Sequence, residues 1–121
     1  MLIYDTLSRI KKPFLPRKHG QVQMFVCGPT VYDDPHIGHG RSYVCFDVVA
    51  KYLKFLGYNV TFNINVTDID DKVIKRAQEE GVEYGVIAER YASAFDDALR
   101  DLGVDSISGQ YWATDCISEI I

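Results

Sequence analysis

The chain has 121 residues, of which 47% are hydrophobic and 25% are charged, and its formal net charge is −4 at pH 7. This length allows one domain with a single core, and the composition is ordinary for a globular protein. Its apolar runs are too short for a membrane span, and its three cysteines indicate a reducing, cytoplasmic compartment instead of a disulfide framework. The negative charge excludes a general attraction to polyanions.

The first 20 residues predict little regular structure. A short β element over residues 2–4 leads into a turn-rich segment that contains Pro13 and Pro16. This segment also holds the chain's main concentration of positive charge, formed by Arg9, Lys11, Lys12, Arg17 and Lys18. A solvated basic face is the ordinary interpretation of such a cluster.

Residues 21–66 have the pattern of a strand, a long helix and a second strand. Residues 21–27 end in an apolar run, which is typical of a strand buried on both faces of a parallel sheet. A helix is expected from about Ile37 to Leu56, ended by Gly57, and residues 58–66 alternate with a period of two. This order predicts a crossover between parallel strands. The positions expected to face inward are Val44, Val48, Tyr52, Leu53 and Leu56 in the helix, and Val60, Phe62, Ile64 and Val66 in the second strand.

Residues 67–121 are expected to be mainly helical. One helix should run over residues 69–80, with Thr67 or Asp68 as its cap and Gly81 beyond its end. A second helix over residues 83–102 should stop at Gly103 and be followed by a loop over residues 104–113. The second helix is expected to bury Ile87, Tyr91, Phe95, Ala98 and Leu102.

A last helix is expected to begin at residue 117, with Thr114 or Asp115 as its cap. The chain ends on two isoleucines inside an apolar pattern, which predicts a truncation point. An exposed sheet edge and an apolar helix end would favour self-association, and the oligomeric state stays open.

Three features should meet at one edge of the predicted sheet, because ligands of open α/β sheets bind beyond the carboxyl ends of the strands. Cys27 ends the first strand, the turn over residues 65–68 follows the second, and His36 and His39 stand where the helix begins. A helix N-terminus offers free N–H groups and a partial positive charge to phosphates. Two imidazoles and the guanidinium of Arg41 can hold phosphoryl oxygens that gain charge in a transition state. This edge is therefore predicted to bind a nucleotide.

The stretches FVCGPTVYDDPHIGH, over residues 25–39, and NVTDIDDK, over residues 65–72, strongly resemble the amino-terminal part of cysteinyl-tRNA synthetase, a class I aminoacyl-tRNA synthetase. The resemblance runs from about Tyr4 to the last residue and covers the first part of the family's catalytic domain. It implies an α/β fold, a Rossmann-like parallel sheet with crossover helices, of which this chain holds the first half. Residues 1–20 would be a lead-in with two short strands, residues 21–66 the βαβ unit and residues 67–121 a helical extension.

The resemblance also implies an activity and a set of site residues. The activity is ATP-dependent activation of cysteine to cysteinyl-adenylate, followed by transfer to tRNA(Cys). Catalysis is assigned to His36 and His39, whose alternative role is helix capping. The implied ATP-binding residues are Pro29, Thr30, Tyr32, His36, Ile37, Gly38, His39 and Arg41, and the implied cysteine pocket is bordered by Gly28, Thr30 and Thr67. For Thr67, a role as a helix cap is equally compatible with the sequence.

Metal binding is implied at one cysteine. Cys27 matches the family's amino-terminal zinc ligand, although a buried free cysteine is the alternative. The family's other zinc ligands come from later sequence, and Cys45 and Cys116 match no ligand position. ATP is expected to bring Mg²⁺. The three carboxylates over residues 68–71 could form a magnesium site but are more typical of caps and ion-pair partners.

The sequence leaves several alternatives open. The lysine-rich KMSKS loop and the anticodon domain of the family do not occur in the 121 residues, so the chain alone is expected to be inactive. The rival functions are a noncatalytic nucleotide- or partner-binding module and a cysteine–amino-sugar ligase on the same scaffold. The basic cluster of residues 9–18 could lie near the acceptor end of tRNA, although the main electrostatic contact with tRNA is expected elsewhere. No membrane partner is expected.

Overall fold

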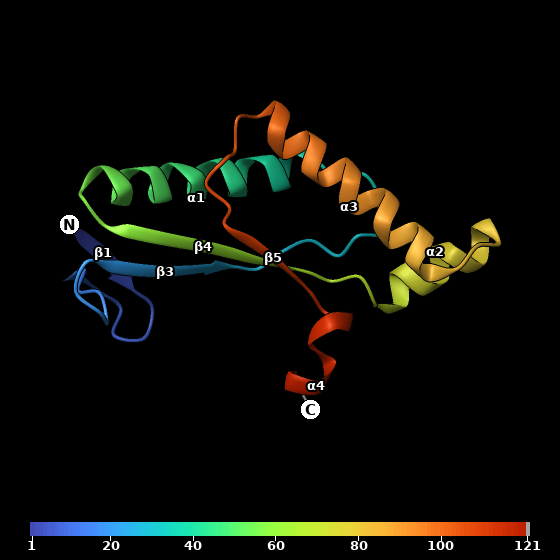
Figure 1. Ribbon diagram of the computed structural model, residues 1–121, viewed down its shortest axis with the longest axis horizontal. Coiled ribbons are helices and arrows are strands. Elements are labelled where there is room, and N and C mark those ends of the chain that lie inside the picture. Colours follow the sequence, from blue (N-terminus) through green and yellow to red (C-terminus); the bar gives the residue numbers. More distant parts are fainter. Residues whose placement is uncertain (121) are drawn as a thin grey trace.

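The computed structural model describes residues 1–120 of the chain. Three strands form one parallel sheet in the order β3–β4–β5, with β3 over Gln21–Val26, β4 over Asn59–Val66 and β5 over Gly109–Trp112. Two helices, α1 (Ile37–Phe55) and α3 (Tyr84–Asp101), lie on the same face of this sheet (Figure 1). The α/β class and the parallel pairing of the first two core strands are thus confirmed.

The strands bury one face and leave the other open. In β4, the inward positions Val60, Phe62, Ile64 and Val66 are all buried, as the period of two predicts. In β3, Val22 and Val26 are buried, whereas Gln23 and Phe25 are exposed. The prediction that β3 is buried on both faces is therefore wrong for residues 1–120, because α1 and α3 both pack on the same side.

The buried stripe of α1 differs from the predicted one. Helix α1 buries Tyr43, Asp47, Ala50 and Leu53, whereas the predicted inward residues Val44, Val48, Tyr52 and Leu56 are 36%, 59%, 47% and 42% exposed. Only Leu53 was placed correctly. The observed stripe is rotated by about one residue, because Tyr43 and Asp47 find buried hydrogen-bond partners that residue hydrophobicity alone does not reveal.

The strand β5 falls inside the predicted loop over residues 104–113, so that prediction is wrong. It pairs in parallel with β4, joining Asn63 to Gly109 and Val66 to Trp112. The backbone N–H of Ser108 donates to Phe62 O (2.6 Å), and the N–H of Phe62 donates to Ser108 Oγ (3.0 Å). The Ser and Gly content of this segment predicts a loop, and the strand is short and only half-buried. It forms because the chain crosses back to pair with β4, which the local composition does not reveal.

Asp47 fastens this crossover to α1. Its buried carboxylate accepts the backbone N–H groups of Asp105 (3.2 Å) and Ser106 (2.9 Å) and pairs with Lys51 (2.7 Å). Burial alone would raise the pKa of Asp47, but the hydrogen bonds from Lys51 and Ser106 hold the pKa below its usual value. The buried polar residue thus sets which face of α1 meets the rest of the chain.

The α2 helix (Asp71–Glu80) and α3 follow β4. The cap of α2 is Asp70, whose carboxylate accepts the N–H of Lys72 (2.9 Å), so neither Thr67 nor Asp68 caps it. Gly81 ends α2 and Gly103 follows α3, both in the left-handed region as predicted. In α3, Ile87, Tyr91 and Phe95 are buried as predicted, but Leu99 replaces Ala98 and Leu102 as the last core contact.

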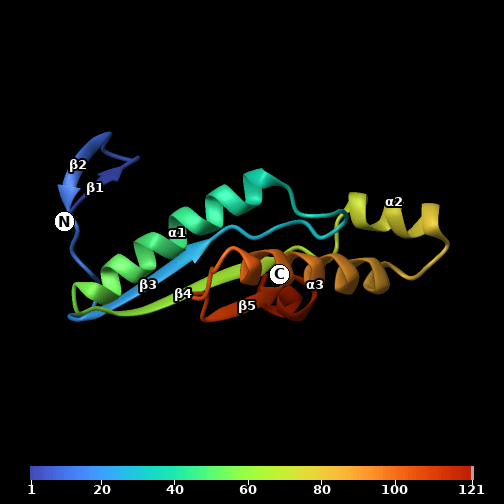
Figure 2. The same ribbon diagram turned by 90° about the horizontal axis from the view of Figure 1, so that it is seen from above.

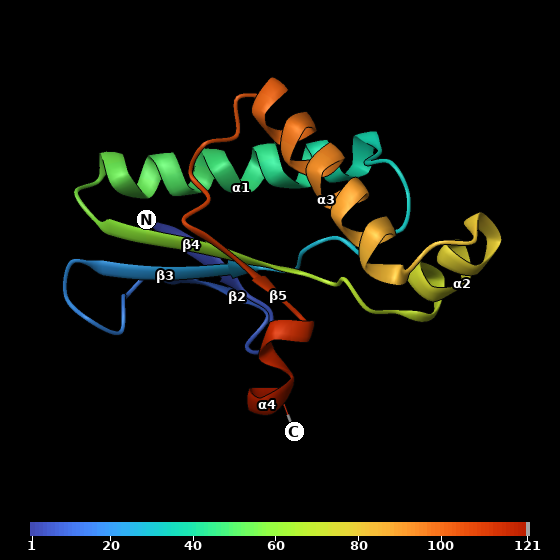
Figure 3. The same ribbon diagram turned by 45° about the vertical axis from the view of Figure 1, so that its right-hand side comes forward.

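The two ends of the described chain lie away from this α/β layer. The lead-in, residues 1–20, contains the antiparallel pair β1 (Leu2–Asp5) and β2 (Ile10–Pro13), which confirms the expected two short strands. After β5 come a 3₁₀ turn, η1 (Thr114–Cys116), and α4 (Ile117–Ile120), on the opposite side of the sheet from α1 (Figure 3). Within residues 1–120, no helix is long and apolar enough to span a membrane.

Candidate functional site

The carboxyl ends of β3 and β4 and the start of α1 form one region, which we call the strand-end site (residues 27–30, 36–39 and 65–67). Beyond the strands, a parallel bridge joins Thr30 to Thr67. The N–H of Val31 donates to Thr67 O (3.2 Å), and the N–H of Thr67 donates to Pro29 O (2.9 Å). Seen from above, α2 extends past this end of the sheet (Figure 2). The sheet pairing thus continues into the two turns that carry the predicted pocket residues.

The two histidines form a reciprocal cap at the start of α1. Nδ1 of His36 accepts the N–H of Gly38 (3.1 Å), and Nδ1 of His39 accepts the N–H of His36 (3.3 Å). Their rings stack with centroids 4.0 Å apart. A Cβ at Gly38 would lie 2.8 Å from Cε1 of His36, so a side chain at this position would displace the His36 ring from the cap. Capping, the alternative role for these histidines, is therefore observed.

This cap also fixes the chemistry of the rings. A neutral imidazole that accepts a hydrogen bond at Nδ1 carries its proton on Nε2. Partial burial, with a further contribution from His36, lowers the pKa of His39 below its ordinary value of 6.5, so His39 is neutral at pH 7. Each ring can then donate from Nε2 at a helix N-terminus, where the backbone favours an anion. Capping and phosphate binding use different nitrogens and are compatible.

Gly28 holds the two strand ends against each other. A Cβ at this position would lie 1.4 Å from the carbonyl oxygen of Asn65, so a side chain has no room. The N–H of Gly28 donates to Asn65 Oδ1 (2.7 Å), and Asn65 Nδ2 donates to Thr67 Oγ1 (3.1 Å). Asn65 thereby links the two predicted pocket residues Gly28 and Thr67. Sequence reasoning missed Asn65, although its place at the end of β4 was a usable signal.

Cys27 lies just beyond β3, and within residues 1–120 it is exposed and does not belong to the buried core. Its carbonyl accepts the hydroxyl of the buried Tyr43 (2.9 Å). Burial raises the pKa of Tyr43 to about 12, so this hydroxyl stays a donor. Tyr43 packs edge-on against Phe95, which also meets the ring of His39 (centroids 5.0 and 6.2 Å away). Tyr43, missed by sequence reasoning, thus connects Cys27 with the histidine pair.

The remaining predicted residues are distributed unevenly. A small hollow of about 10 Å³ lies between the loop over residues 29–35 and α3, and its lining includes Pro29, Thr30, His39, Tyr91 and Phe95. Tyr32 lies instead by α2, with Lys72 Nζ 5.1 Å from its ring centroid. Ile37 is 88% exposed, and Arg41 is also exposed on α1. The structure therefore gathers Pro29, Thr30 and His39 around this hollow. Tyr32, Ile37 and Arg41 lie outside it.

The acidic stretch after β4 serves the fold. Asp68 is buried and accepts the N–H (3.1 Å) and the hydroxyl of Thr114. Thr114 is therefore a partner of Asp68. Thr114 and Asp115, the expected caps of the last helix, both lie inside η1, the turn that precedes α4. Within residues 1–120, no group of three or more His, Cys, Asp or Glu side chains converges on a metal position. At the strand-end site, these residues supply one thiol, that of Cys27.

Comparison with known protein families identifies the family of this chain. The family model described as the catalytic domain of class I (C) tRNA synthetases matches residues 13–121. The chain belongs to this family. The class I assignment, made from the sequence through the histidine motif and the TDIDDK stretch, is confirmed.

Curated relatives of this synthetase-family chain carry the name cysteine–tRNA ligase. The relative from Trichlorobacter lovleyi is 50% identical over 119 residues, which is 98% of this chain and 24% of the relative. The relative from Thermoplasma volcanium is 50% identical over 121 residues, or 100% of this chain and 27% of the relative. The chain thus spans about a quarter of the length of the curated relatives it matches.

Solved structures support the same class I synthetase fold. A methionyl-tRNA synthetase from Mycobacterium tuberculosis, bound by methionyl-adenylate, superposes with a TM-score of 0.68 at 25% identity, over 78% of this chain and 19% of that one. The LeuRS–tRNA–LeuAMS complex from Agrobacterium radiobacter also gives 0.68, at 20% identity, over 80% of this chain and 13% of that one. This second likeness concerns the fold alone.

Proposed function

We propose that this chain forms the amino-terminal part of a cysteine–tRNA ligase, which activates cysteine with ATP and transfers it to tRNA(Cys). The observation that carries the proposal is the arrangement of His36 and His39, whose Nδ1 atoms are used by the cap of α1 so that both Nε2–H groups remain free to donate. The names of the relatives support cysteine as the amino acid. A cytoplasmic location is part of the same proposal.

In the first step, an oxygen of the cysteine carboxylate attacks the α-phosphorus of ATP, which is bound with Mg²⁺. The bond from the α-phosphorus to its bridging oxygen breaks, and pyrophosphate leaves with the electron pair. Negative charge grows on the phosphoryl oxygens, where the Nε2–H groups of His36 and His39 and the N-terminus of α1 stabilise it. No covalent enzyme intermediate is needed, because positioning and electrostatics lower the barrier.

In the second step, a hydroxyl of the terminal ribose of tRNA attacks the carbonyl carbon of cysteinyl-adenylate. The hydroxyl releases its proton, and AMP leaves. We place cysteine beside Gly28, Thr30 and Thr67, where the Asn65 hydrogen bonds hold both strand ends in register. ATP would lie along Pro29, Tyr32, Gly38 and the first turn of α1, with Ile37 and Arg41 at its rim.

Zinc binding is proposed at Cys27 alone. A thiolate-rich zinc site would select cysteine by binding its thiolate. The exposed thiol of Cys27 suits one ligand position, but residues 1–120 do not form a zinc site by themselves. We therefore propose Cys27 as a single ligand, and the two steps above do not pass through the metal. The zinc content of the purified protein and of its Cys27→Ser variant tests this assignment independently of activity.

Cysteine-dependent exchange of pyrophosphate into ATP tests the function. The protein as its gene encodes it should show exchange with cysteine and then charge tRNA(Cys), while residues 1–121 alone should be silent. Exchange followed by transfer to an amino sugar would favour the related ligase instead. A protein that binds ATP but never exchanges, with zinc supplied, would overturn the proposal in favour of a binding module.

A further inference from the structure

Charge is distributed very unevenly between the lead-in and the rest of the chain. Residues 1–20 contain five basic side chains and one acidic side chain, Asp5, whereas residues 21–121 contain eight basic and sixteen acidic ones. A short basic segment on an acidic body is a common arrangement for polyanion binding, because repulsion from the body confines the contact to the segment.

The basic side chains of the lead-in are available for such a contact. Arg9, Lys11, Arg17 and Lys18 are exposed, and within residues 1–120 none of the four forms an ion pair with a carboxylate. Lys12 alone is paired, with Asp5 (2.8 Å). By contrast, five of the basic side chains of the body, at positions 51, 75, 76, 90 and 100, each have an acidic partner.

The same segment borders a hollow on the surface of the described chain. This hollow, which we call the basic hollow, has a volume of about 420 Å³ and lies between the end of the lead-in and the start of β3. Its lining includes Phe14, Leu15, Arg17, Lys18, Val22 and Gln23. Phe14 is held by an edge contact with Tyr58 (ring centroids 6.0 Å apart). Its volume is within the range of small-ligand sites, and it combines apolar walls with two free cations.

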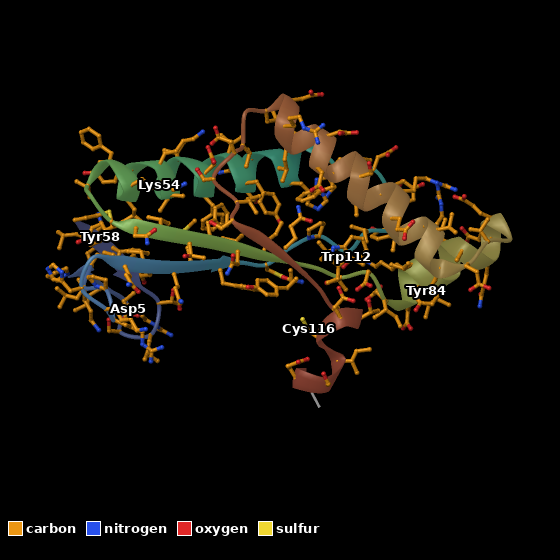
Figure 4. The ribbon with its side chains drawn as sticks, viewed as in Figure 1. Asp5, Lys54, Tyr58, Tyr84, Trp112 and Cys116 are labelled. Atoms are coloured by element: carbon orange, nitrogen blue, oxygen red, sulfur yellow. The ribbon has the colours of Figure 1, made fainter. Side chains whose placement is uncertain are left out.

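The basic hollow lies far from the strand-end site. The lead-in with Asp5 sits near Tyr58, at the amino end of the sheet, while Trp112 lies toward the opposite end (Figure 4). Helix α1 runs along the sheet from the strand-end site toward Tyr58, and its 19 residues correspond to roughly 28 Å at 1.5 Å per residue. One small nucleotide cannot occupy both places, but an extended RNA can.

We propose that the basic hollow is a second RNA-binding surface, which contacts tRNA at a distance from the reacting end. Arg17 and Lys18 bind backbone phosphates, and the hollow beside Phe14 and Val22 receives one nucleotide, in the way aromatic and basic side chains hold unpaired nucleotides. This inference rests on the proposed function for the identity of the RNA. It adds a contact that the strand-end site does not need.

Binding of a fluorescent tRNA(Cys) transcript to the gene-encoded protein, measured between 50 and 200 mM salt, tests the inference. The variant Arg17→Gln/Lys18→Gln should bind about tenfold more weakly at low salt, and the slope of log affinity against log salt should fall by about 2. The matched control Lys75→Gln/Arg100→Gln, which removes the same charge from the body, should keep the parent slope. The charge-preserving Arg17→Lys/Lys18→Arg should bind like the parent.

Cysteine-dependent exchange, which requires no tRNA, separates this inference from the proposed function and reports folding of the variants. Unchanged exchange with weakened tRNA binding supports the second surface. Equal losses in the lead-in and control variants would overturn it, as would parent-like binding of Arg17→Gln/Lys18→Gln. The affinity for AMP is measured with the same variants. If Arg17→Gln/Lys18→Gln weakened the binding of AMP but not the binding of tRNA(Cys), the inference would also be overturned, in favour of a free-nucleotide pocket. Were exchange absent even in the parent, the binding comparison would still decide the matter.

Discussion

The strand-end site and the lead-in (residues 1–20) are built in contrasting ways. At the strand-end site, backbone groups are held by specific partners: Asn65 binds the N–H of Gly28, Tyr43 binds the carbonyl of Cys27, and the histidine pair caps α1. In the lead-in, most side chains are exposed and one ion pair, Lys12–Asp5, joins the two strands. Chemistry at a phosphorus atom needs fixed donors, whereas phosphate binding by charge needs only exposed cations. The strand-end site, with its fixed hydrogen-bond partners, therefore suits the proposed chemistry, and the lead-in, with its exposed cations, suits the proposed phosphate binding.

The largest effect on stability is expected at Gly28. In Gly28→Ala the new Cβ would collide with the backbone carbonyl of Asn65, 1.4 Å away, so the strand ends must separate at a cost of about 3 kcal/mol or more. The control Gly85→Ala has open space around its Cβ and should be neutral or slightly stabilising. Denaturant unfolding compares the two, and equal stability would show that the strand ends are not tightly joined.

A smaller loss is expected when the crossover is released from α1. Asp47→Asn weakens the bonds to Asp105, Ser106 and Lys51 and should cost about 2 kcal/mol. Because the pKa of Asp47 is lowered in the folded state, its contribution is present above pH about 4 and is lost as pH falls through the folded value. The difference in unfolding free energy between the parent and Asp47→Asn should therefore shrink as the pH falls below about 4. A difference that does not change with pH would contradict this account.

The hydroxyl of Tyr43 should contribute little to the stability of the fold and more to the position of Cys27. Tyr43→Phe loses one hydrogen bond to the carbonyl of Cys27, at a cost of about 1 kcal/mol. If Tyr43 positions Cys27, the KM for cysteine should rise while the KM for ATP stays the same. A loss of stability with both constants unchanged would leave the hydroxyl a purely structural role.

The smallest effect is expected in the lead-in. Lys12 holds the pKa of Asp5 well below its usual range, yet Lys12 is exposed and Asp5 is partly exposed to solvent, and such surface pairs contribute little to stability. Lys12→Gln should therefore leave the denaturation midpoint where it is in the parent. A shift as large as that of Asp47→Asn would show that the lead-in is part of the cooperative fold.

The sequence predicted the elements that local patterns encode. The alternation of β4, the start of α1 after His36 and the glycine ends of α2 and α3 all follow from short-range rules. It failed where a distant partner decides the outcome. The inward face of α1 depends on Asp47 meeting residues 105–106, and β5 depends on a crossover that returns to β4. For the same reason Tyr43 and Asn65 were missed, since their roles exist only once the strand ends are brought together.

The most direct test of the strand-end site separates the two roles of His39. In His39→Asn, the amide oxygen can replace Nδ1 as the cap acceptor but the Nε2 donor is lost; in His39→Gln, the amide nitrogen can replace Nε2 while the cap is lost. We expect His39→Asn to keep its stability and lose about 100-fold or more in the rate of cysteine-dependent exchange. His39→Gln should lose about 1 kcal/mol of stability and keep more of the rate. An Asn variant as active as the parent would show that this histidine only caps the helix, which would contradict the proposed catalytic site.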